Sequence, residues 1–160
     1  MDSQKRISII YQTLFKKLSI FSGAVIKTNK GLITIKFKPE LAPITVGNFV
    51  HLAKKNFYDG IIFHRVVPGF VIQAGDPTGT GWGGPGYEII SEFSPEEFKT
   101  GAVGIASAGK DTEGSQFFIM HGYYPHLNSR YTLFADVVGG IDVVMKISED
   151  DQIISVELFK

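Results

Sequence analysis

The spacing of apolar side chains along the chain changes at residue 24. Before it, apolar residues recur every three or four positions, which is the period of one helix face. They are Ile7, Ile10, Leu14, Leu18 and Phe21. The pattern predicts that residues 1–23 form an N-terminal extension with helical character. No apolar run in the sequence approaches the ~18 residues of a membrane span.

Three interpretations of this extension stay open. It can be a helix packed on the rest of the chain, a basic helix on an anionic membrane surface, or a segment that binds a partner or frays. A secretory signal needs an unbroken apolar centre, and Gln12, Lys16 and Lys17 interrupt it here. We therefore predict no cleaved signal and a cytoplasmic protein. Packing on the domain is favoured over membrane contact.

From residue 24 onward, short runs rich in β-branched and aromatic residues predict strands. Residues 24–28 and 32–37 flank Asn29-Lys30-Gly31, where Gly31 can take the positive φ of a hairpin turn. Further strand-like runs cover residues 61–67, 70–74, 102–106, 117–120, 131–138 and 153–159. The pattern therefore predicts eight short strands.

Two helices are expected among these strands. Thr45 is the expected cap of a helix that runs to about Lys55, and Gly139-Gly140 precedes a short helix at residues 141–147. Eight strands and two helices in residues 24–160 predict a mainly β domain. Its expected form is a closed eight-stranded antiparallel β-barrel capped by two α-helices.

The amino-acid composition indicates the class of domain and excludes some kinds of site. The chain has 160 residues, of which 44% are hydrophobic and 18 are Gly, and this fits one globular domain with many tight turns. The sequence contains no Cys. Disulfides, thiolate metal sites and a cysteine nucleophile are therefore excluded.

The charges cancel overall but are unevenly distributed. Sixteen basic and sixteen acidic residues argue against a protein that binds nucleic acid through bulk phosphate attraction. Residues 1–80 hold 11 Lys and Arg against 4 Asp and Glu, whereas residues 81–160 hold 5 against 12. Either the first half carries a basic arm or, as we favour, the two halves fold together and neutralise each other.

Neither the glycine-rich loop at residues 78–86 nor the histidines predict a cofactor site. The loop lacks the GK[ST] ending of a phosphate-binding loop. His51, His64, His121 and His126 show no metal-binding spacing. We therefore expect no metal and no organic cofactor.

The most informative stretch runs from Phe63 to Asp76. In it, Arg65 and Gln73 take positions where a buried strand would carry apolar groups. A cation and an amide among aromatic residues form a poor core but a good polar clamp in an apolar pocket. Residues 114–119 repeat the theme of an amide beside two phenylalanines. Together the two stretches predict an apolar pocket with a fixed cation.

Three long motifs of the chain resemble the cyclophilin family, in particular its compact bacterial members. They read FHRVVPGFVIQAGDPTGTG at residues 63–81, ASAGKDTEGSQFFI at 106–119 and PHLNSRYTLFADVV at 125–138. The resemblance covers residues 24–160 and implies the barrel described above. It also implies a peptidyl-prolyl cis–trans isomerase that acts on proline-containing polypeptides and assists protein folding without a cofactor. We expect the protein to be a monomer.

Matched position by position, the resemblance assigns roles to twelve residues. It makes Arg65 catalytic, with Gln73 holding Arg65 and the substrate carbonyl. It pairs the substrate backbone with the edge segment Ala106, Ser107 and Ala108. It lines the rest of the binding site with Phe70, Val71, Gln116, Phe118, His126, Leu127 and Tyr131.

Four of these positions depart from the best-known eukaryotic pattern. Val71 replaces a methionine, Ser107 an asparagine, His126 a tryptophan and Tyr131 a histidine. Val71 keeps an apolar side chain, and Ser107 can still present its backbone to the substrate. The residues at positions 126 and 131 occur in many bacterial members. The departures therefore predict weaker binding of the inhibitor cyclosporin rather than loss of activity.

A second function stays open, that of a module which binds proline-containing peptides with little turnover and serves as a scaffold. The complete set of Arg65, Phe70, Gln73, Gln116 and Phe118 favours the enzyme. A binding module has no evident need for the arginine.

Overall fold

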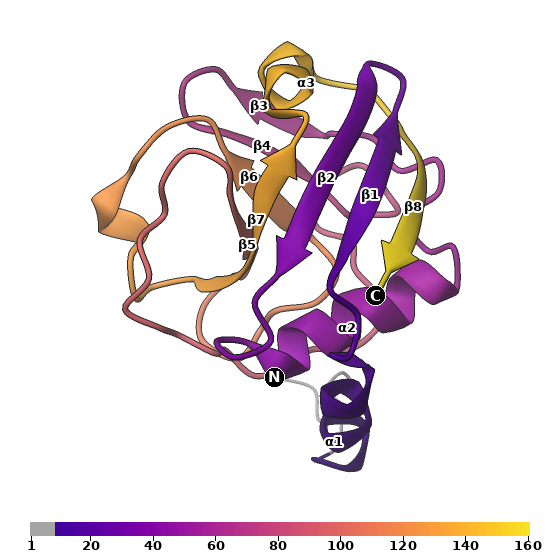
Figure 1. Cartoon of the computed structure of the whole chain (residues 1–160), viewed down its shortest axis with the longest axis vertical. Coiled ribbons are helices and arrows are strands. Elements are labelled where there is room, and N and C mark those ends of the chain that lie inside the picture. Colours follow the sequence, from indigo (N-terminus) through magenta and orange to yellow (C-terminus); the bar gives the residue numbers. More distant parts are fainter. Residues whose placement is uncertain (1–8) are drawn as a thin grey trace.

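Eight short strands join into one antiparallel sheet in the computed structural model, which describes residues 9–160 (Figure 1). The strands are β1 (Gly23–Thr28), β2 (Gly31–Phe37), β3 (Arg65–Val67), β4 (Val71–Ala74), β5 (Ala102–Ile105), β6 (Phe117–Met120), β7 (Thr132–Gly139) and β8 (Ile153–Phe159). The helices are α1 (Ile9–Leu18), α2 (Pro43–Lys54) and α3 (Ile141–Lys146), and a 3-10 turn spans Pro125–Leu127. The predicted strand count is confirmed, as is the first hairpin, in which Gly31 has a φ of 133°.

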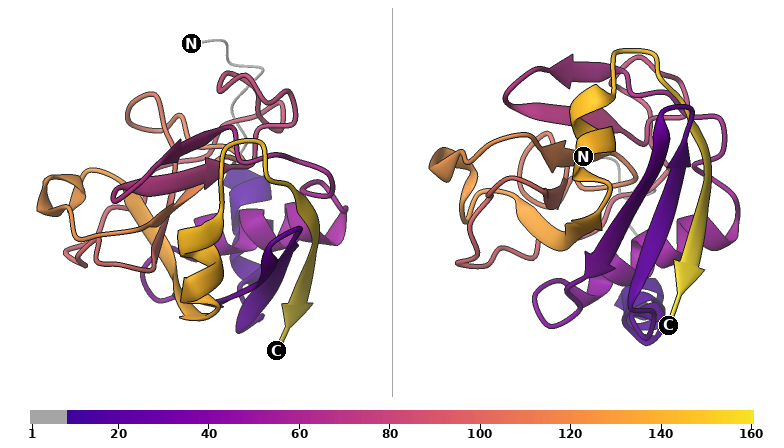
Figure 2. Two further views of the ribbon diagram at one scale, coloured as in Figure 1. Left: turned by 90° about the horizontal axis from the view of Figure 1, so that it is seen from above. Right: turned by 45° about the horizontal axis from the view of Figure 1, so that its top comes forward.

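The sheet curls strongly but does not close (Figure 2). Its strand order, β3-β4-β6-β5-β7-β2-β1-β8, leaves β3 and β8 as edges. Residues 61–63, which precede β3, meet residues 151–153, which include the first residue of β8. The Phe63 N–H donates to the Asp151 carbonyl at 2.8 Å and the Ile153 N–H to the Ile61 carbonyl at 2.9 Å. β3 is only three residues long and pairs with β4 alone. The prediction of a closed barrel therefore went too far, and the sheet is a half-barrel.

Helices α2 and α3 lie at opposite ends of the curled sheet (Figure 1). The prediction that Thr45 caps α2 is wrong, because the helix begins at Pro43 and its cap residue is Ala42, which makes no side-chain cap hydrogen bond. The N–H groups of Ile44 and Thr45 instead donate to the Glu92 carboxylate at 3.2 and 2.7 Å. A carboxylate from a distant loop thus satisfies the free amides and suits the positive end of the helix dipole.

The sheet carries two buried apolar clusters, one on each face. The interior cluster surrounds Phe49 of α2, whose ring lies 5.7 Å from that of Phe117. Successive strand residues face opposite sides of a sheet. Ile72 and Phe117 therefore belong to the interior cluster, whereas Val71 and Phe118 belong to the cluster on the outer face.

The same alternation explains how Arg65 and Gln73 stand in an apolar stretch without entering the core. Ile72 and Ala74 fill the interior positions of β4, and Val66 of β3 packs against them. Arg65 is exposed, Gln73 is half-buried, and the two are direct partners across β3 and β4. They lie on the outer face of the sheet, where polar groups do not weaken the core.

Helix α1 packs against α2 at the end of the molecule away from α3 (Figure 1). The helices approach so closely that a Cβ atom at Gly47 would overlap the Phe15 carbonyl. Phe15 is 3% exposed, and its ring centroid lies 5.2 Å from that of His51 and 6.1 Å from that of Tyr87. This contact supports the packed-helix interpretation, although residues 1–8 lie outside the described part. Within residues 9–160, no helix has the length and apolar character needed to cross a membrane.

Replacing Phe15 with alanine should lower the free energy of unfolding by about 1–3 kcal/mol, the value of burying one large apolar side chain. Unfolding of α1 alone limits the loss, because the helix can detach while the sheet remains folded. Thermal and denaturant unfolding measure the effect. Leu14→Ala is the matched control, since Leu14 belongs to the same helix but is 45% exposed. Equal losses in the two variants would contradict the packing of α1.

Candidate active site

Three neighbouring strands bring the central candidate residues to one face. In the register of β3, β4 and β6, Arg65 stands opposite Gln73, and Gln73 stands opposite Phe118. Residues directly opposite on antiparallel strands share a face. A guanidinium, an amide and an aromatic ring therefore meet on the outer face of the sheet, placed there by strand pairing.

A chain of side-chain amides fixes the orientation of Arg65. The Gln116 Nε2 donates to the carbonyl oxygens of Gly81 and Gly83, both at 2.9 Å. The Gln116 Oε1 accepts from Gln73 Nε2 at 3.0 Å, and Gln73 Oε1 accepts from Arg65 Nη1 at 3.5 Å. Each carboxamide has one donor end and one acceptor end. The backbone of the glycine-rich loop thus determines which end of each side-chain amide donates and which accepts, as far as the Arg65 guanidinium.

Apolar side chains surround a cavity of about 210 Å³ beside this guanidinium. Arg65 lies over the Phe70 ring, 5.7 Å from its centroid, in a cation–π arrangement. Tyr131 meets Phe118 edge to face at 5.7 Å, and Leu127 adds a buried aliphatic wall. The cavity can take a compact apolar ring and hold it next to a fixed cation.

The Phe118 ring has room at this position because residue 104 is a glycine. A Cβ atom at Gly104 would overlap both the Phe118 ring and the Phe98 ring. Phe98 stacks on Phe118 at 5.6 Å, and its N–H donates to Asn128 Oδ1 at 2.7 Å. Strand β5 and the loop that carries Phe98 therefore hold the aromatic wall of the cavity.

The structure brings nine of the twelve predicted residues to this cavity. These nine are Arg65, Phe70, Val71, Gln73, Ala106, Ser107, Phe118, Leu127 and Tyr131. Of the remaining three, Ala108 and Gln116 line a neighbouring cavity. His126 is exposed and stacks on Phe70 with a centroid distance of 6.3 Å. The contributions of all twelve residues to binding or catalysis stay predictions.

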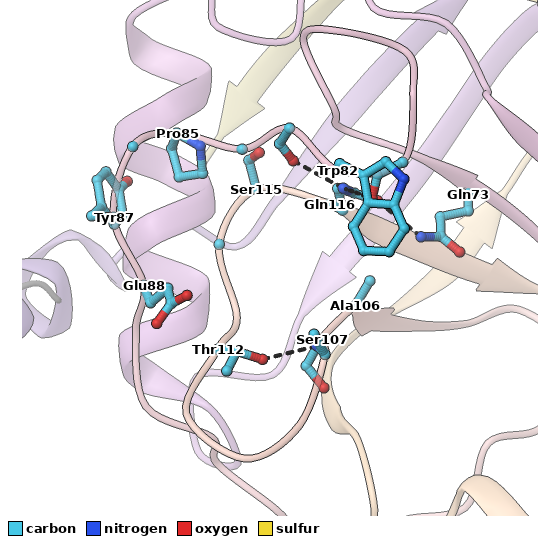
Figure 3. Close-up of a pocket in the computed structure, with 16 residues that line it drawn as sticks. Gln73, Trp82, Pro85, Tyr87, Glu88, Ala106, Ser107, Thr112, Ser115 and Gln116 are labelled. Carbon is cyan, nitrogen blue, oxygen red and sulfur yellow. Dashed lines mark hydrogen bonds between the residues drawn. The ribbon is translucent and has the colours of Figure 1, made fainter. Parts of the chain in front are cut away.

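The neighbouring cavity is larger, about 530 Å³, and shares Gln73, Ala106 and Ser107 with the first (Figure 3). The glycine-rich loop and residues 106–116 form most of its walls. Sequence reasoning missed this cavity and, with it, Trp82 and Glu88. The one signal for it was the single Trp of the chain, which stands among glycines.

Buried Asp76 organises the glycine-rich loop. Its Oδ1 accepts from the N–H and the hydroxyl of Thr78 at 2.8 and 2.7 Å, and its Oδ2 accepts from the Gly81 N–H at 2.6 Å. Burial alone would raise the pKa of Asp76, but hydrogen bonds from Thr78, Gly83 and Gly81 lower that pKa to about 2. The loop that anchors Gln116 therefore depends on an ionised carboxylate.

Replacing Asp76 with asparagine should cost about 2 kcal/mol of folding free energy at neutral pH, because an amide NH2 would then face backbone donors. In the wild type, this contribution is complete above the ordinary Asp pKa of 3.8 and is lost as the pH falls through about 2. The stability difference between the two proteins should therefore shrink from about pH 5 to about pH 2. Denaturant titrations across this range measure it, and a difference independent of pH would contradict the role of Asp76.

Comparison with known proteins identifies relatives of this chain. The family model described as cyclophilin type peptidyl-prolyl cis-trans isomerase/CLD matches residues 24–157. Peptidyl-prolyl cis-trans isomerase B of Bacillus subtilis is 51% identical over 121 residues, which are 74% of this chain and 85% of that protein. A peptidyl-prolyl cis-trans isomerase of Helicobacter pylori is 45% identical over 150 residues, with 91% and 92% coverage.

Solved structures show the same fold. A cyclophilin type peptidyl-prolyl cis-trans isomerase of Cryptosporidium parvum has a TM-score of 0.83 at 31% identity, covering 88% of this chain and 98% of that one. A structure of that protein in the presence of the dipeptide Ala-Pro has a TM-score of 0.82 at 30% identity, with 86% and 99% coverage. The resemblance seen in the sequence motifs is confirmed, and the chain belongs to the family of cyclophilin-type peptidyl-prolyl cis–trans isomerases.

Proposed function

We propose that this protein accelerates rotation about X–Pro peptide bonds, with Arg65 as the catalytic residue and Gln73 as the residue that positions it. The observation that carries the proposal is a guanidinium held beside an apolar cavity by a chain of amide hydrogen bonds. Family membership supports the same activity. The remaining cavity residues bind the peptide around the proline.

The chemistry of rotation explains why an arginine is needed. Amide resonance gives the C–N bond partial double-bond character, with a barrier of ~18–20 kcal/mol. In the twisted transition state this resonance is lost and the proline nitrogen regains a lone pair. A guanidinium directed at that nitrogen stabilises the twisted form more than either planar form, which is the differential binding that catalysis requires. No bond is made or broken, so neither a nucleophile nor an acid–base pair takes part.

The segment from Ala106 to Ala108 can receive the substrate backbone. The Ala106 N–H already donates to the Gln116 carbonyl at 2.8 Å, and the Ala108 N–H donates to Thr112 Oγ1 at 2.8 Å. Between them, the Ser107 N–H has no hydrogen-bond partner among residues 9–160. Backbone pairing at Ser107 would place the proline ring between Phe118, Leu127 and Tyr131, next to Arg65.

One measurement distinguishes the enzyme from the alternative function, a module that binds proline-containing peptides with little turnover. A protease-coupled assay follows the cis–trans relaxation of a short X–Pro peptide with and without the protein. We expect relaxation to accelerate in proportion to protein concentration. Rates equal to those in buffer, together with measurable peptide binding, would leave the binding module as the function.

The proposal also includes the substrate class, the cellular role, the oligomeric state and the inhibitor binding that the sequence predicts. Proline-containing polypeptides are the substrates, and assistance to protein folding in the cytoplasm is the expected role. The protein is expected to act as a monomer and to bind cyclosporin weakly because of His126. The packing of Phe15 against α2 supports a helix docked on the domain rather than one on a membrane surface.

A further inference from the structure

The larger cavity beside the proline site contains a carboxylate and, among the described residues that line it, no cation. Of the described residues that line it, Glu88 alone carries a charge. Figure 3 shows the Glu88 side chain turned from its segment toward the Thr112 side of the cavity. Its Oε2 is buried and accepts no hydrogen bond from residues 9–160. A carboxylate that is partly removed from water and left without a donor favours the approach of a cation.

The rim of the same cavity carries an exposed indole. Trp82 is 92% exposed and lines the cavity at the end where Gln73 and Gln116 lie (Figure 3). Its backbone is held in place, since the Trp82 backbone N–H donates to Thr80 Oγ1 at 3.2 Å and the neighbouring Gly81 is bound to Asp76. A solvent-facing aromatic ring attracts ammonium and guanidinium groups. A long cationic side chain that enters beside Gln73 would pass Trp82 and extend toward Glu88.

Two further carboxylates belong to segments next to Glu88 or opposite it in the cavity. The cavity walls after Gly81 belong to the half of the chain that holds 12 acidic against 5 basic residues. Glu113 pairs in the backbone with Ile89, next to Glu88, and Asp111 accepts from the Ser91 N–H at 3.0 Å. Within residues 106–116, Lys110 stands against Asp111 and Glu113, so this wall carries a net negative charge that favours a positive ligand group.

We propose that this cavity gives the enzyme a preference for substrates that carry Lys or Arg close to the proline. The inference rests on the proposed isomerase function and adds the class of substrate. The two cavities share Gln73, Ala106 and Ser107, and an extended peptide advances ~3.3 Å per residue. Because the two cavities adjoin, the basic residue is expected at one of the few positions on either side of the proline.

Peptides of matched size test the preference. Each carries one X–Pro core and has Lys, norleucine or Glu at one of the three positions on either side of the core. At one position, Lys should raise kcat/KM about 3- to 10-fold over norleucine, mainly through KM, as expected for an exposed ion pair with a cation–π contact. Glu should lower it. About 1 M NaCl should remove most of the difference, because salt screens such charges.

Two substitutions at Glu88 test whether this residue causes the preference for Lys. Glu88→Gln should bring the Lys-to-norleucine ratio close to one, and Glu88→Lys should reverse the preference in favour of the Glu peptide. Glu157→Gln is the matched control, since Glu157 is an exposed residue of β8 outside both cavities. That control should keep the wild-type ratio.

The outcomes separate this inference from the function on which it rests. Turnover of all peptides with equal kcat/KM would overturn the preference and leave the isomerase intact. A preference for Lys that persists unchanged in Glu88→Gln would also overturn it. If no peptide is turned over, titration of the same peptides by calorimetry still decides the matter, since a higher affinity for the Lys peptide supports the cavity's role and equal affinities contradict it.

Discussion

Replacing Arg65 with alanine is expected to lower kcat/KM for a short X–Pro peptide by about 30- to 1000-fold. This corresponds to ~2–4 kcal/mol, the range for removing one preorganised electrostatic donor from an active site. The loss should fall mainly on kcat, because the interaction with the proline nitrogen strengthens only as the bond twists. The protease-coupled assay measures both parameters.

The folded structure should survive this substitution. Arg65 is exposed on the outer face of the sheet, and its contacts with Phe70 and Gln73 lie at the cavity. Arg65→Lys is the matched control, since it keeps the charge but loses the planar fork that Gln73 orients, and its activity should be intermediate. Thermal unfolding of both variants checks the fold. Wild-type turnover in Arg65→Ala would contradict the catalytic role, and failure to fold would favour a structural one.

Most of the fold could be predicted because its signals are local. Runs of aromatic and β-branched residues predicted β6 and β8 at their observed bounds, and Gly31 marked the first hairpin. The errors arose where distant segments decide the outcome. Glu92 reaches α2 from a loop 47 positions beyond Thr45, so local capping rules placed the cap of this helix three residues late. Whether the sheet closes into a barrel depended on the length of β3, and the spacing of apolar residues does not predict that length.

The candidate site was predictable in its residues but not in its construction. Arg65 and Gln73 stood out as polar groups in an apolar stretch, yet the face on which they lie follows from the register of β3 with β4. The link from Gln116 to Gly81 and Gly83 requires that β6 and the glycine-rich loop meet in space. The residue spacing within one segment does not predict a contact between two distant segments. Glu88 and Trp82 escaped notice for the same reason.

The second large effect concerns inhibition by cyclosporin. His126→Trp is expected to tighten cyclosporin binding by about 10- to 100-fold, or ~1–3 kcal/mol, the value of burying a large aromatic side chain. His126 is exposed on the 3-10 turn, stacks on Phe70 at 6.3 Å and meets Tyr124 edge to face at 5.8 Å. A side chain at this position thus projects along the rim of the proline cavity.

An indole at position 126 would extend this aromatic rim and add an N–H donor for a macrocycle that covers it. A short peptide reaches mainly the proline cavity and Arg65, so its turnover should change much less than the inhibition constant. Tyr123→Trp is the control, because Tyr123 is exposed and lines neither cavity. Inhibition curves on the three proteins provide the measurement. An inhibition constant that is unchanged in His126→Trp would show that residue 126 does not set cyclosporin affinity, and the position-by-position match to the family would then fail at this residue.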